Sequence, residues 1–349
     1  MKKFLLPLFL LVSIPAFAQQ ATVPLPVPPA APVAARSFLL MDFQSNQVLA
    51  SQNIHERVEP ASLTKLMTAY LTFTALRQKQ LQVSQPVPVS ERAWRAEGSR
   101  MFIEPNRPVT VDELMRGMIV QSGNDACIAL AEAIAGSEEV FAQMMNREAQ
   151  RLGMKNTSFV NSTGLPHPQH YSTAYDLALL AAAIIRDFPE YYPLYSQKEY
   201  RYNNISQSNR NRLLWTDPTV DGVKTGHTEA AGYCLITSAR RGERRLVSVV
   251  LGAASDSVRA QESQKLLNYG FQFYDLVRLY AKGQPVDKPL QVWKGSLNTV
   301  KAGFTQDLFV SVPKGFGDRL KATLETQKPL IAPIAAGQKV GMVKLTLDG

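Results

Sequence analysis

The spacing of hydrophobic and polar positions changes along the chain and predicts a succession of secondary structures. Residues 37–53, "SFLLMDFQSNQVLASQN", alternate on either side of the Ser45-Asn46 turn signal, which predicts a β-hairpin. From Pro60 the spacing becomes helical. Helical spacing returns in four later segments: 111–120, 124–136, 137–153 and 173–188. We therefore expect the middle of the chain to be rich in helices.

After Val220 the pattern predicts mainly strands. Short β-rich runs at 233–238 and 246–251 are separated by Gly and charged residues, as in consecutive antiparallel strands. A further helix is predicted over 257–276. Beyond about residue 285 the runs "LFVSVP", "RLKATLET" and "VGMVKLTL" predict a small all-β domain. No internal repeat at a fixed period is present, which argues against a solenoid or propeller.

The N-terminus has the features of an export signal. Lys2 and Lys3 precede an apolar run that ends in Ala16-Phe17-Ala18, typical of a cleaved secretory signal peptide. An uncleaved membrane anchor is the alternative, although the run is short for a hydrocarbon core about 30 Å thick. The predicted division is a signal peptide at 1–18, a Pro/Ala-rich extended linker at 19–35, an α/β domain at 36–284 and a β domain at 285–349.

Composition narrows the class of protein. With 45% hydrophobic and 19% charged residues, the chain is an ordinary globular protein. Its net charge of +9 comes without a Lys/Arg block, so we expect no nucleic-acid partner. Two cysteines, Cys127 and Cys234, are too few for a disulfide framework, and we interpret both as buried apolar residues. The sequence leaves open whether they pair.

The segment "PASLTKLMTAY" places Ser62 three residues before Lys65 at the head of a predicted helix. This offset puts both side chains on one helical face, and free N–H groups of the first turn can stabilise an oxyanion. A serine needs a base to become nucleophilic, and a lysine serves only when its pKa falls by about three units, roughly 4 kcal/mol. Burial and a second cation can supply that shift. Taken alone the pattern is weak, because serine often caps helices and lysine is often exposed.

Two further segments strengthen the chemical interpretation. Ser122-Gly123-Asn124 interrupts a helical pattern, and Lys224-Thr225-Gly226 lies in a predicted strand. Alone, the first is typical of a turn and the second of a strand end. Together the motifs S-x-x-K, S-D-N and K-T-G are a known signature of class A β-lactamases and penicillin-binding proteins. Here they occur in that order, with S-G-N as the middle element.

The surrounding residues extend the resemblance. "EPASLTK", "MRGMIVQSGNDAC" and "VDGVKTGHTEAAGY" closely resemble the low-molecular-mass penicillin-binding proteins, specifically the exported serine D-alanyl-D-alanine carboxypeptidases of Gram-negative bacteria. The resemblance covers Ser37 to Gly349. It implies a five-stranded antiparallel sheet flanked by helices, followed by a small β-sandwich-like domain.

The resemblance also implies the reaction. The enzyme would remove the terminal D-alanine from peptidoglycan pentapeptides through an acyl-enzyme on Ser62, without metal or cofactor. Lys65 would be the base, Ser122 would relay protons to the leaving D-alanine, and Asn124 would hold the substrate amide and orient Lys65. Lys224 would be the cation that lowers the pKa of Lys65. β-Lactams would inhibit by acylating the same serine.

Substrate binding would involve a strand edge and cations. The backbone of Thr225, Gly226 and His227 would lie beside the substrate, and the N–H groups of Ser62 and His227 would form the oxyanion hole. Arg210 and Arg259 are the candidates to bind the terminal carboxylate, with help from Thr225. Solvated surface arginines are the alternative for both.

Two departures from the family pattern limit what is carried over. No cationic amphipathic helix follows "KLTLDG", so these residues give no support to peripheral anchoring at the inner membrane, and such contact stays open. The export signal predicts a periplasmic location, and the oligomeric state is left open. Cys234 replaces a residue that is usually polar.

Four other classes of protein are the alternatives to this interpretation. A zinc carboxypeptidase lacks its H-E-x-x-H ligands, and a Ser-His-Asp hydrolase lacks G-x-S-x-G. A β-lactamase would use the same acylation with fast deacylation, and the β domain and the S-G-N triplet favour the carboxypeptidase. A catalytically silent wall-binding module would keep the fold without activating Ser62.

Overall fold

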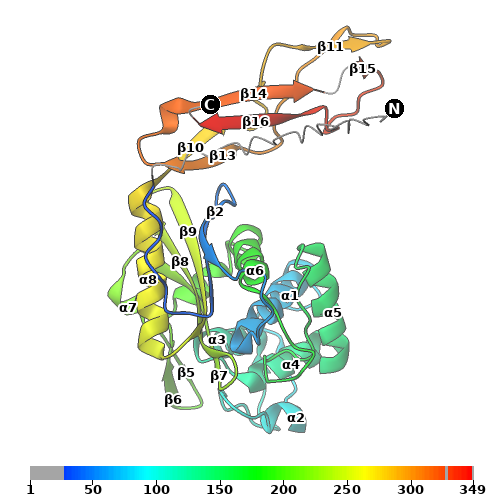
Figure 1. The fold of residues 1–349 in the computed structure, drawn as a ribbon. Helices are drawn as coiled ribbons and strands as arrows, with labels where there is room; N and C mark the ends of the chain where they lie inside the picture. The colour runs from blue at the N-terminus through cyan, green and yellow to red at the C-terminus, as the bar shows by residue number, and fades with distance from the viewer. Residues whose placement is uncertain (1–26, 327–328, 348–349) are drawn as a thin grey trace, which may run out of the picture.

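The computed structural model describes residues 27–326 and 329–347, so the predicted signal peptide lies outside the described residues. The chain builds a larger body of helices around one sheet and a smaller, all-β C-terminal part (Figure 1). This confirms the predicted α/β class with a β-rich C-terminal addition.

The body is organised on a five-stranded antiparallel sheet in the order β2-β1-β9-β8-β7. The strands are β1 (Ser37–Asp42), β2 (Val48–Gln52), β7 (Val220–Thr228), β8 (Gly232–Arg241) and β9 (Arg244–Ala253). The predicted hairpin and the consecutive later strands are therefore confirmed. Because β7 lies at one edge, its outer backbone groups have no strand partner within this sheet.

Helices cover both faces of the sheet (Figure 1). The helical elements of the body are η1 (Ala61–Thr64), α1 (Lys65–Arg77), α2 (Glu91–Trp94), α3 (Val111–Val120), α4 (Asn124–Ala135), α5 (Glu138–Arg151), α6 (Ala174–Asp187), η2 (Tyr192–Ser196), α7 (Leu213–Thr216) and α8 (Asp256–Phe273). The four predicted helices of the middle region are confirmed within two residues. Their starts follow from capping: Thr110 and Glu113 form a capping box at α3, and the hydroxyls of Ser137 and Thr173 accept N–H groups of α5 and α6.

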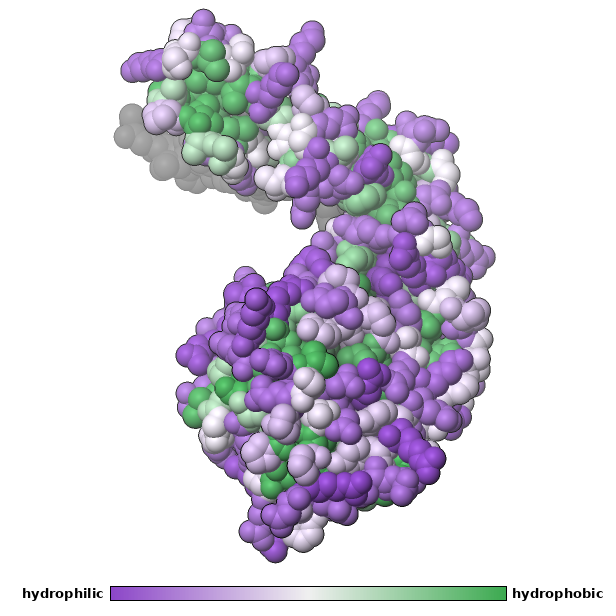
Figure 2. Space-filling view, turned by 180° about the vertical axis from the view of Figure 1, so that it is seen from behind, coloured by the Kyte–Doolittle hydropathy of each residue, from purple (hydrophilic) through white to green (hydrophobic). Residues whose placement is uncertain are grey.

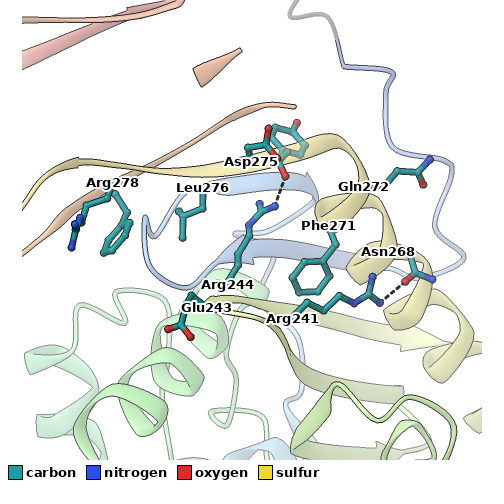
Figure 3. A pocket seen from close by; sticks show the side chains of 11 residues that line it. Arg241, Glu243, Arg244, Asn268, Phe271, Gln272, Asp275, Leu276 and Arg278 are labelled. Atoms are coloured by element: carbon teal, nitrogen blue, oxygen red, sulfur yellow. Dashed lines mark hydrogen bonds between the residues drawn. The ribbon is translucent and has the colours of Figure 1, made fainter. Parts of the chain in front are cut away.

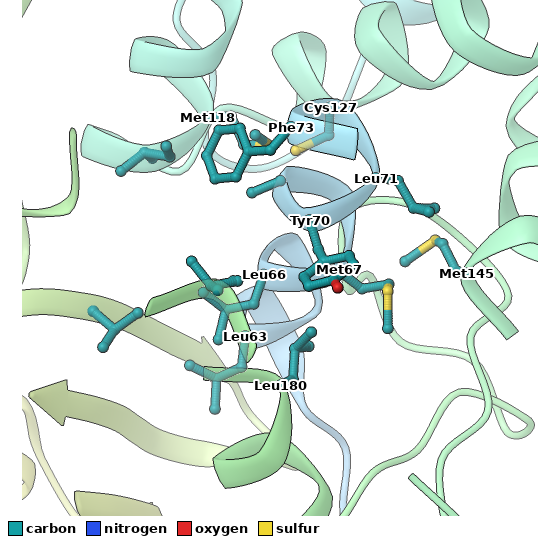
Figure 4. Close-up of a cluster of buried hydrophobic side chains, with 14 of the residues drawn as sticks. Leu63, Leu66, Met67, Tyr70, Leu71, Phe73, Met118, Cys127, Met145 and Leu180 are labelled. Atoms are coloured by element: carbon teal, nitrogen blue, oxygen red, sulfur yellow. The ribbon is translucent and has the colours of Figure 1, made fainter. Parts of the chain in front are cut away.

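Two short hairpins complete the body: β3 (Pro86–Val87) with β4 (Val109–Thr110), and β5 (Glu199–Tyr202) with β6 (Ile205–Ser208). The main core surrounds α1, which is buried along nearly all of its length (Figure 4). Leu66, Phe73 and Cys127 are among its fully buried side chains. Cys127 and Cys234 are both buried, which confirms the sequence interpretation. They are not paired with each other.

The C-terminal part consists of β10 (Tyr274–Tyr280), β11 (Leu290–Trp293), β12 (Thr299–Val300), β13 (Leu308–Pro313), η3 (Gly317–Arg319), β14 (Leu320–Thr326), β15 (Leu330–Ile331) and β16 (Gly341–Leu347). The three strands predicted there are confirmed. The strands of the C-terminal part pair as β10-β13, β12-β11-β15 and β14-β16. Seen from behind, this part projects from the body and carries apolar surface at its far end (Figure 2).

The junction between the two parts differs from the sequence prediction. The helix expected over 257–276 ends at Phe273, and Tyr274 begins strand β10, which pairs with β13. Arg244 holds this turn because its guanidinium donates to the carbonyl oxygens of Gly270 and Tyr274 and pairs with buried Asp42 at 2.8 Å. We therefore propose that the C-terminal part begins near Tyr274 rather than at residue 285.

The segment predicted as an extended linker is partly docked on the body. The amine of Lys265 donates to the Pro32 carbonyl at 2.7 Å, and the Tyr269 hydroxyl donates to the Pro28 carbonyl at 2.9 Å, so residues 28–32 lie along α8. Val33 is buried in the core between α8 and the sheet. Ordered structure thus begins before Ser37. Over the described ranges, none of the helices has both the length and the apolar character that crossing a bilayer requires.

Candidate active site

The three motifs meet at one cleft of about 540 Å³. Its lining includes Ser62, Ser122 and the 225–227 segment of β7. Strand β7 approaches the Ser62 turn closely, because a Cβ on Gly226 would lie 3.1 Å from the Pro60 carbonyl oxygen. Glycine in K-T-G therefore lets the strand edge lie against the turn that carries Ser62.

Ser62 and Lys65 are in direct contact. The Lys65 Nζ lies 3.0 Å from the Ser62 Oγ. Ser62 belongs to the short 3-10 helix η1 and not to the first turn of the α-helix, which begins at Lys65. The hydroxyl of Ser62 is accessible from the cleft, while Lys65 is only 1% exposed. This is the arrangement that an activated serine requires: a reachable nucleophile beside a desolvated amine.

The environment of Lys65 favours the neutral amine. Burial, assisted by the positive charge of Arg210, lowers the pKa of Lys65 from 10.5 to about 8, against the opposing effects of nearby anionic groups. At pH 7 about one amine in ten is then neutral, compared with about one in 3,000 at the ordinary value. The cation that assists is Arg210, where the sequence had suggested Lys224.

Lys224 is itself shifted. Burial lowers the pKa of Lys224 well below 10.5, and the charges of Lys65 and Arg210 add to this effect. Its side-chain amine donates to the Thr225 carbonyl at 3.0 Å. The positive charge of Lys65 thus disfavours a second charge on Lys224 in the same buried region.

The S-G-N segment contributes two groups. Asn124 Oδ1 accepts a hydrogen bond from Lys65 at 2.7 Å, and Asn124 Nδ2 donates to the Glu97 carbonyl at 2.6 Å. Ser122 has a positive φ of 67°, and its buried Oγ has no hydrogen-bond partner within the described protein. A buried hydroxyl without a partner is uncommon and fits a group that acts on a bound molecule.

Sequence reasoning missed the carboxylate that holds this segment. Asp125 accepts N–H groups of Met101, Phe102 and Ile103 at 2.8 to 3.2 Å. Burial raises the pKa of Asp125, and these hydrogen bonds act in the opposite direction. The polar residue directly after S-G-N at the start of a helix was the available signal.

Both predicted arginines line the cleft. Arg259 is only 5% exposed, so the surface alternative is wrong for it. Its guanidinium donates to the Gly226 carbonyl at 3.1 Å and pairs with Asp256 at 2.5 Å. Arg210 is more exposed and donates to Ser99 Oγ at 2.8 Å. His227 is exposed at the β7 edge, and its ring lies tilted against that of Tyr233 with the centroids 4.0 Å apart.

A larger cavity of about 780 Å³ lies at the junction with the C-terminal part (Figure 3). Arginines, including Arg241 and Arg244, are among its lining residues, and Arg241 bonds Asn268. It holds no serine, cysteine or lysine among its lining residues. The smaller cleft, which is lined by Ser62 and Ser122, is therefore the better candidate for the active site.

The site combines a serine in contact with a buried lysine, a second lysine and an amide, and it is built on a five-stranded antiparallel sheet. This combination defines a serine acyl-transfer enzyme of the penicillin-binding type. Comparison with known proteins agrees. The family model described as D-alanyl-D-alanine carboxypeptidase matches residues 22–255, and that of the penicillin-binding protein 5 C-terminal domain matches residues 274–349. The chain belongs to the D-alanyl-D-alanine carboxypeptidase family.

Individual relatives cover most of the chain. D-alanyl-D-alanine carboxypeptidase DacC of Escherichia coli (strain K12) is 44% identical over 96% of this chain and 84% of its own. The structure of penicillin binding protein 5 from Haemophilus influenzae has a TM-score of 0.88 at 42% identity, covering 91% of this chain and 94% of that one. Penicillin-Binding Protein D2 from Listeria monocytogenes, solved in the ampicillin-bound form, has a TM-score of 0.65 at 31% identity over 70% of this chain and all of its own. The chain is thus a serine-type D-alanyl-D-alanine carboxypeptidase, a peptidase of the penicillin-binding class.

Proposed function

We propose that Ser62 is the residue acylated in this reaction and that Lys65 is the base that activates it. The observation that carries the proposal is the 3.0 Å contact between the Ser62 hydroxyl and a fully buried amine. The lowered pKa of about 8 for Lys65 provides the neutral amine that the first step needs.

The proposed reaction has two stages, acylation of Ser62 and hydrolysis of the resulting ester. Neutral Lys65 accepts the proton of Ser62 as Oγ attacks the carbonyl carbon between the last two D-alanines. The negative charge that develops on the carbonyl oxygen is stabilised by the N–H groups of Ser62 and His227. As the peptide C–N bond breaks, Ser122 donates its proton to the departing amine and is reprotonated by Lys65, which gives up the proton that it took from Ser62. Water then attacks the ester, which releases the shortened peptide and restores Ser62.

Binding of the substrate is assigned to the cleft walls. The edge of β7 at Thr225 to His227 has no strand partner on its outer side within the sheet, so an extended peptide can lie along it. Arg259 and Arg210, assisted by Thr225, bind the terminal carboxylate, since a guanidinium fits a carboxylate in charge and shape. Asn124 orients Lys65 and bonds the substrate amide, while Lys224 contributes to the shared hydrogen-bond network.

The natural substrate we propose is the peptidoglycan pentapeptide, with β-lactams as inhibitors that acylate the same serine. The ampicillin- and cefotaxime-bound structures of the Listeria relative support the second point. The adduct formed by a β-lactam on this serine would be hydrolysed slowly.

One experiment tests the assignment. Intact mass is measured before and after benzylpenicillin, alongside release of D-alanine from a pentapeptide. The expected result is a single stable adduct on the wild-type protein, with adduct and D-alanine release both lost in Ser62→Ala and in folded Lys65→Ala. Rapid penicillin turnover without a lasting adduct would indicate a β-lactamase. Absence of both signals in the wild type would favour a silent wall-binding module.

We further propose that the enzyme works in the periplasm after cleavage of residues 1–18. The positively charged start, apolar run and Ala-Phe-Ala site support this. N-terminal sequencing of the protein recovered from a periplasmic fraction should begin near Gln19. Recovery of an intact N-terminus in the membrane fraction would instead support the anchor, and washing membranes with high salt would reveal peripheral contact.

A further inference from the structure

The loop at 160–170 supplies a group of the Lys65 environment that no motif predicted. The backbone carbonyl of Thr163 accepts a hydrogen bond from Lys65 Nζ at 2.6 Å. Asn124 Oδ1 accepts a second at 2.7 Å. A neutral amine has two N–H donors and one lone pair. With both donors taken by these two oxygens, the lone pair is directed to the remaining neighbour, Ser62 Oγ.

The position of the Thr163 carbonyl depends on how the loop is held. Ser162 donates through its backbone N–H and its hydroxyl to buried Glu138, and its carbonyl accepts from Thr68 at 2.6 Å. Gly164 lies against the Ser62 turn with no room for a side chain, since a Cβ there would be 1.8 Å from the Ala61 carbonyl oxygen. The loop and the turn are therefore in close contact.

His170 joins the same loop to the same turn. Its Nδ1 accepts the backbone N–H of Val160 at 3.1 Å, so the proton of the neutral ring is on Nε2. The Nε2 lies 2.8 Å from Thr64 Oγ1 and donates to it. Thr64 is the residue directly before Lys65. The imidazole is 2% exposed, and burial lowers the pKa of His170 to about 4. The ring is therefore neutral at pH values near 7.

We propose that His170 is a positioning residue for catalysis: its bonds to Val160 and Thr64 hold the 160–170 loop against the Ser62 turn and so keep the Thr163 carbonyl aligned on Lys65. The proposal rests on the assignment of Lys65 as the base. It assigns no contact between His170 and the substrate, because His170 is absent from the residues that line the cleft.

The proposal separates two kinetic quantities. The arginines that bind the carboxylate come from other segments, so loosening the loop leaves initial binding intact. The bond-forming step depends on the direction of the lone pair, and a misplacement of about 1 Å can cost on the order of 100-fold in rate. A purely structural role for His170 would lower stability without this selective effect.

The test measures the dissociation constant and the acylation rate constant for benzylpenicillin by rapid mixing, with thermal unfolding followed by circular dichroism. The variants are His170→Phe, which removes both ring bonds, and Thr64→Val, which removes one partner. His170→Gln is the conservative variant, because its amide N–H can reach Thr64 as Nε2–H does. His167→Gln is the matched control, since His167 is an exposed histidine of the same loop.

We expect His170→Phe and Thr64→Val to acylate at least 10-fold more slowly with dissociation constants within 2-fold of wild type, and the double variant to be no slower than His170→Phe. His170→Gln should recover most of the rate, and His167→Gln should match wild type. Unchanged acylation in folded His170→Phe would overturn the proposal, as would a loss in binding alone or multiplicative losses in the double variant. If His170→Phe does not fold, Thr64→Val decides alone. Absence of any wild-type adduct would instead refute the proposed function.

Discussion

Replacing Gly164 by alanine should separate the geometry of the active site from the general cost of backbone strain. Gly164 has a φ of +86°, where an L-residue costs about 1 to 2 kcal/mol. Its added Cβ would also lie 1.8 Å from the Ala61 carbonyl oxygen and 2.9 Å from Thr64 Oγ1. Ordinary van der Waals contacts need well over 3 Å, so the loop and the Ser62 turn must separate by more than about 1 Å.

The chain offers a matched control. Gly153 has a nearly identical φ of +81°, but a Cβ there would meet nothing within 4 Å. Gly153→Ala should therefore lose only the strain cost of about 1 to 2 kcal/mol. Gly164→Ala adds an overpacking cost of about 1 to 3 kcal/mol and should be destabilised by about 2 to 5 kcal/mol in total.

The two variants should differ most in catalysis. Acylation by a fluorescent penicillin is followed on gels under conditions where urea titration shows both variants folded. We expect Gly153→Ala to acylate as wild type and Gly164→Ala to acylate on the order of 100-fold more slowly, because the Lys65 environment is displaced. Acylation of Gly164→Ala within 2-fold of wild type, or equal slowing of both variants, would refute the reasoning.

Three other predictions follow from the described contacts. Protonated Lys65 cannot accept a proton, and its pKa is lowered to about 8. The wild-type acylation rate should therefore rise with pH and level off above about pH 8, and a flat profile from pH 6 to 10 would contradict this. Arg259→Gln should raise KM for a peptide with a free C-terminal carboxylate by about 10-fold or more, since hydrogen bonds to charged groups contribute about 1.5 to 3 kcal/mol. An equal rise in KM for the C-terminally amidated peptide would argue against carboxylate binding. Arg244→Met leaves fully buried Asp42 without its ion-pair partner and should lower the free energy of unfolding in urea by about 3 to 5 kcal/mol. The control Arg240→Met, at an exposed position, should lower it by less than about 0.5 kcal/mol, and similar losses in both variants would count against the buried pair.

Local patterns along the chain were sufficient for most of the secondary structure. The helices at 111–120 and 174–187 begin at capping residues that can be identified in the sequence, and the hairpin at 37–53 has its own turn signal. These features depend on neighbouring residues, so they are readable without tertiary contacts. The helix that starts at Asp256 was harder to delimit, because its end at Phe273 depends on Arg244, which is distant in the sequence.

In the active site, too, some residues can be identified from local sequence and others only from the tertiary structure. The three motifs identified Ser62, Lys65, Ser122 and Lys224 because each motif keeps its spacing within one short segment. Thr163 and His170 act through a backbone carbonyl and a ring whose partners lie about 100 residues away, at Lys65 and Thr64. No local pattern marks such groups, since any residue has a carbonyl and the distance to it is set by folding.

The sequence by itself thus determined which residue types carry the chemistry, their order and the class of enzyme. Only the tertiary structure decided that Lys65 is buried, that Arg210 is the cation that assists in lowering its pKa, and that the Thr163 carbonyl takes one of its N–H donors. The physical reason is that desolvation and the direction of a lone pair depend on surrounding atoms brought together by folding, whereas a motif records only neighbours along the chain.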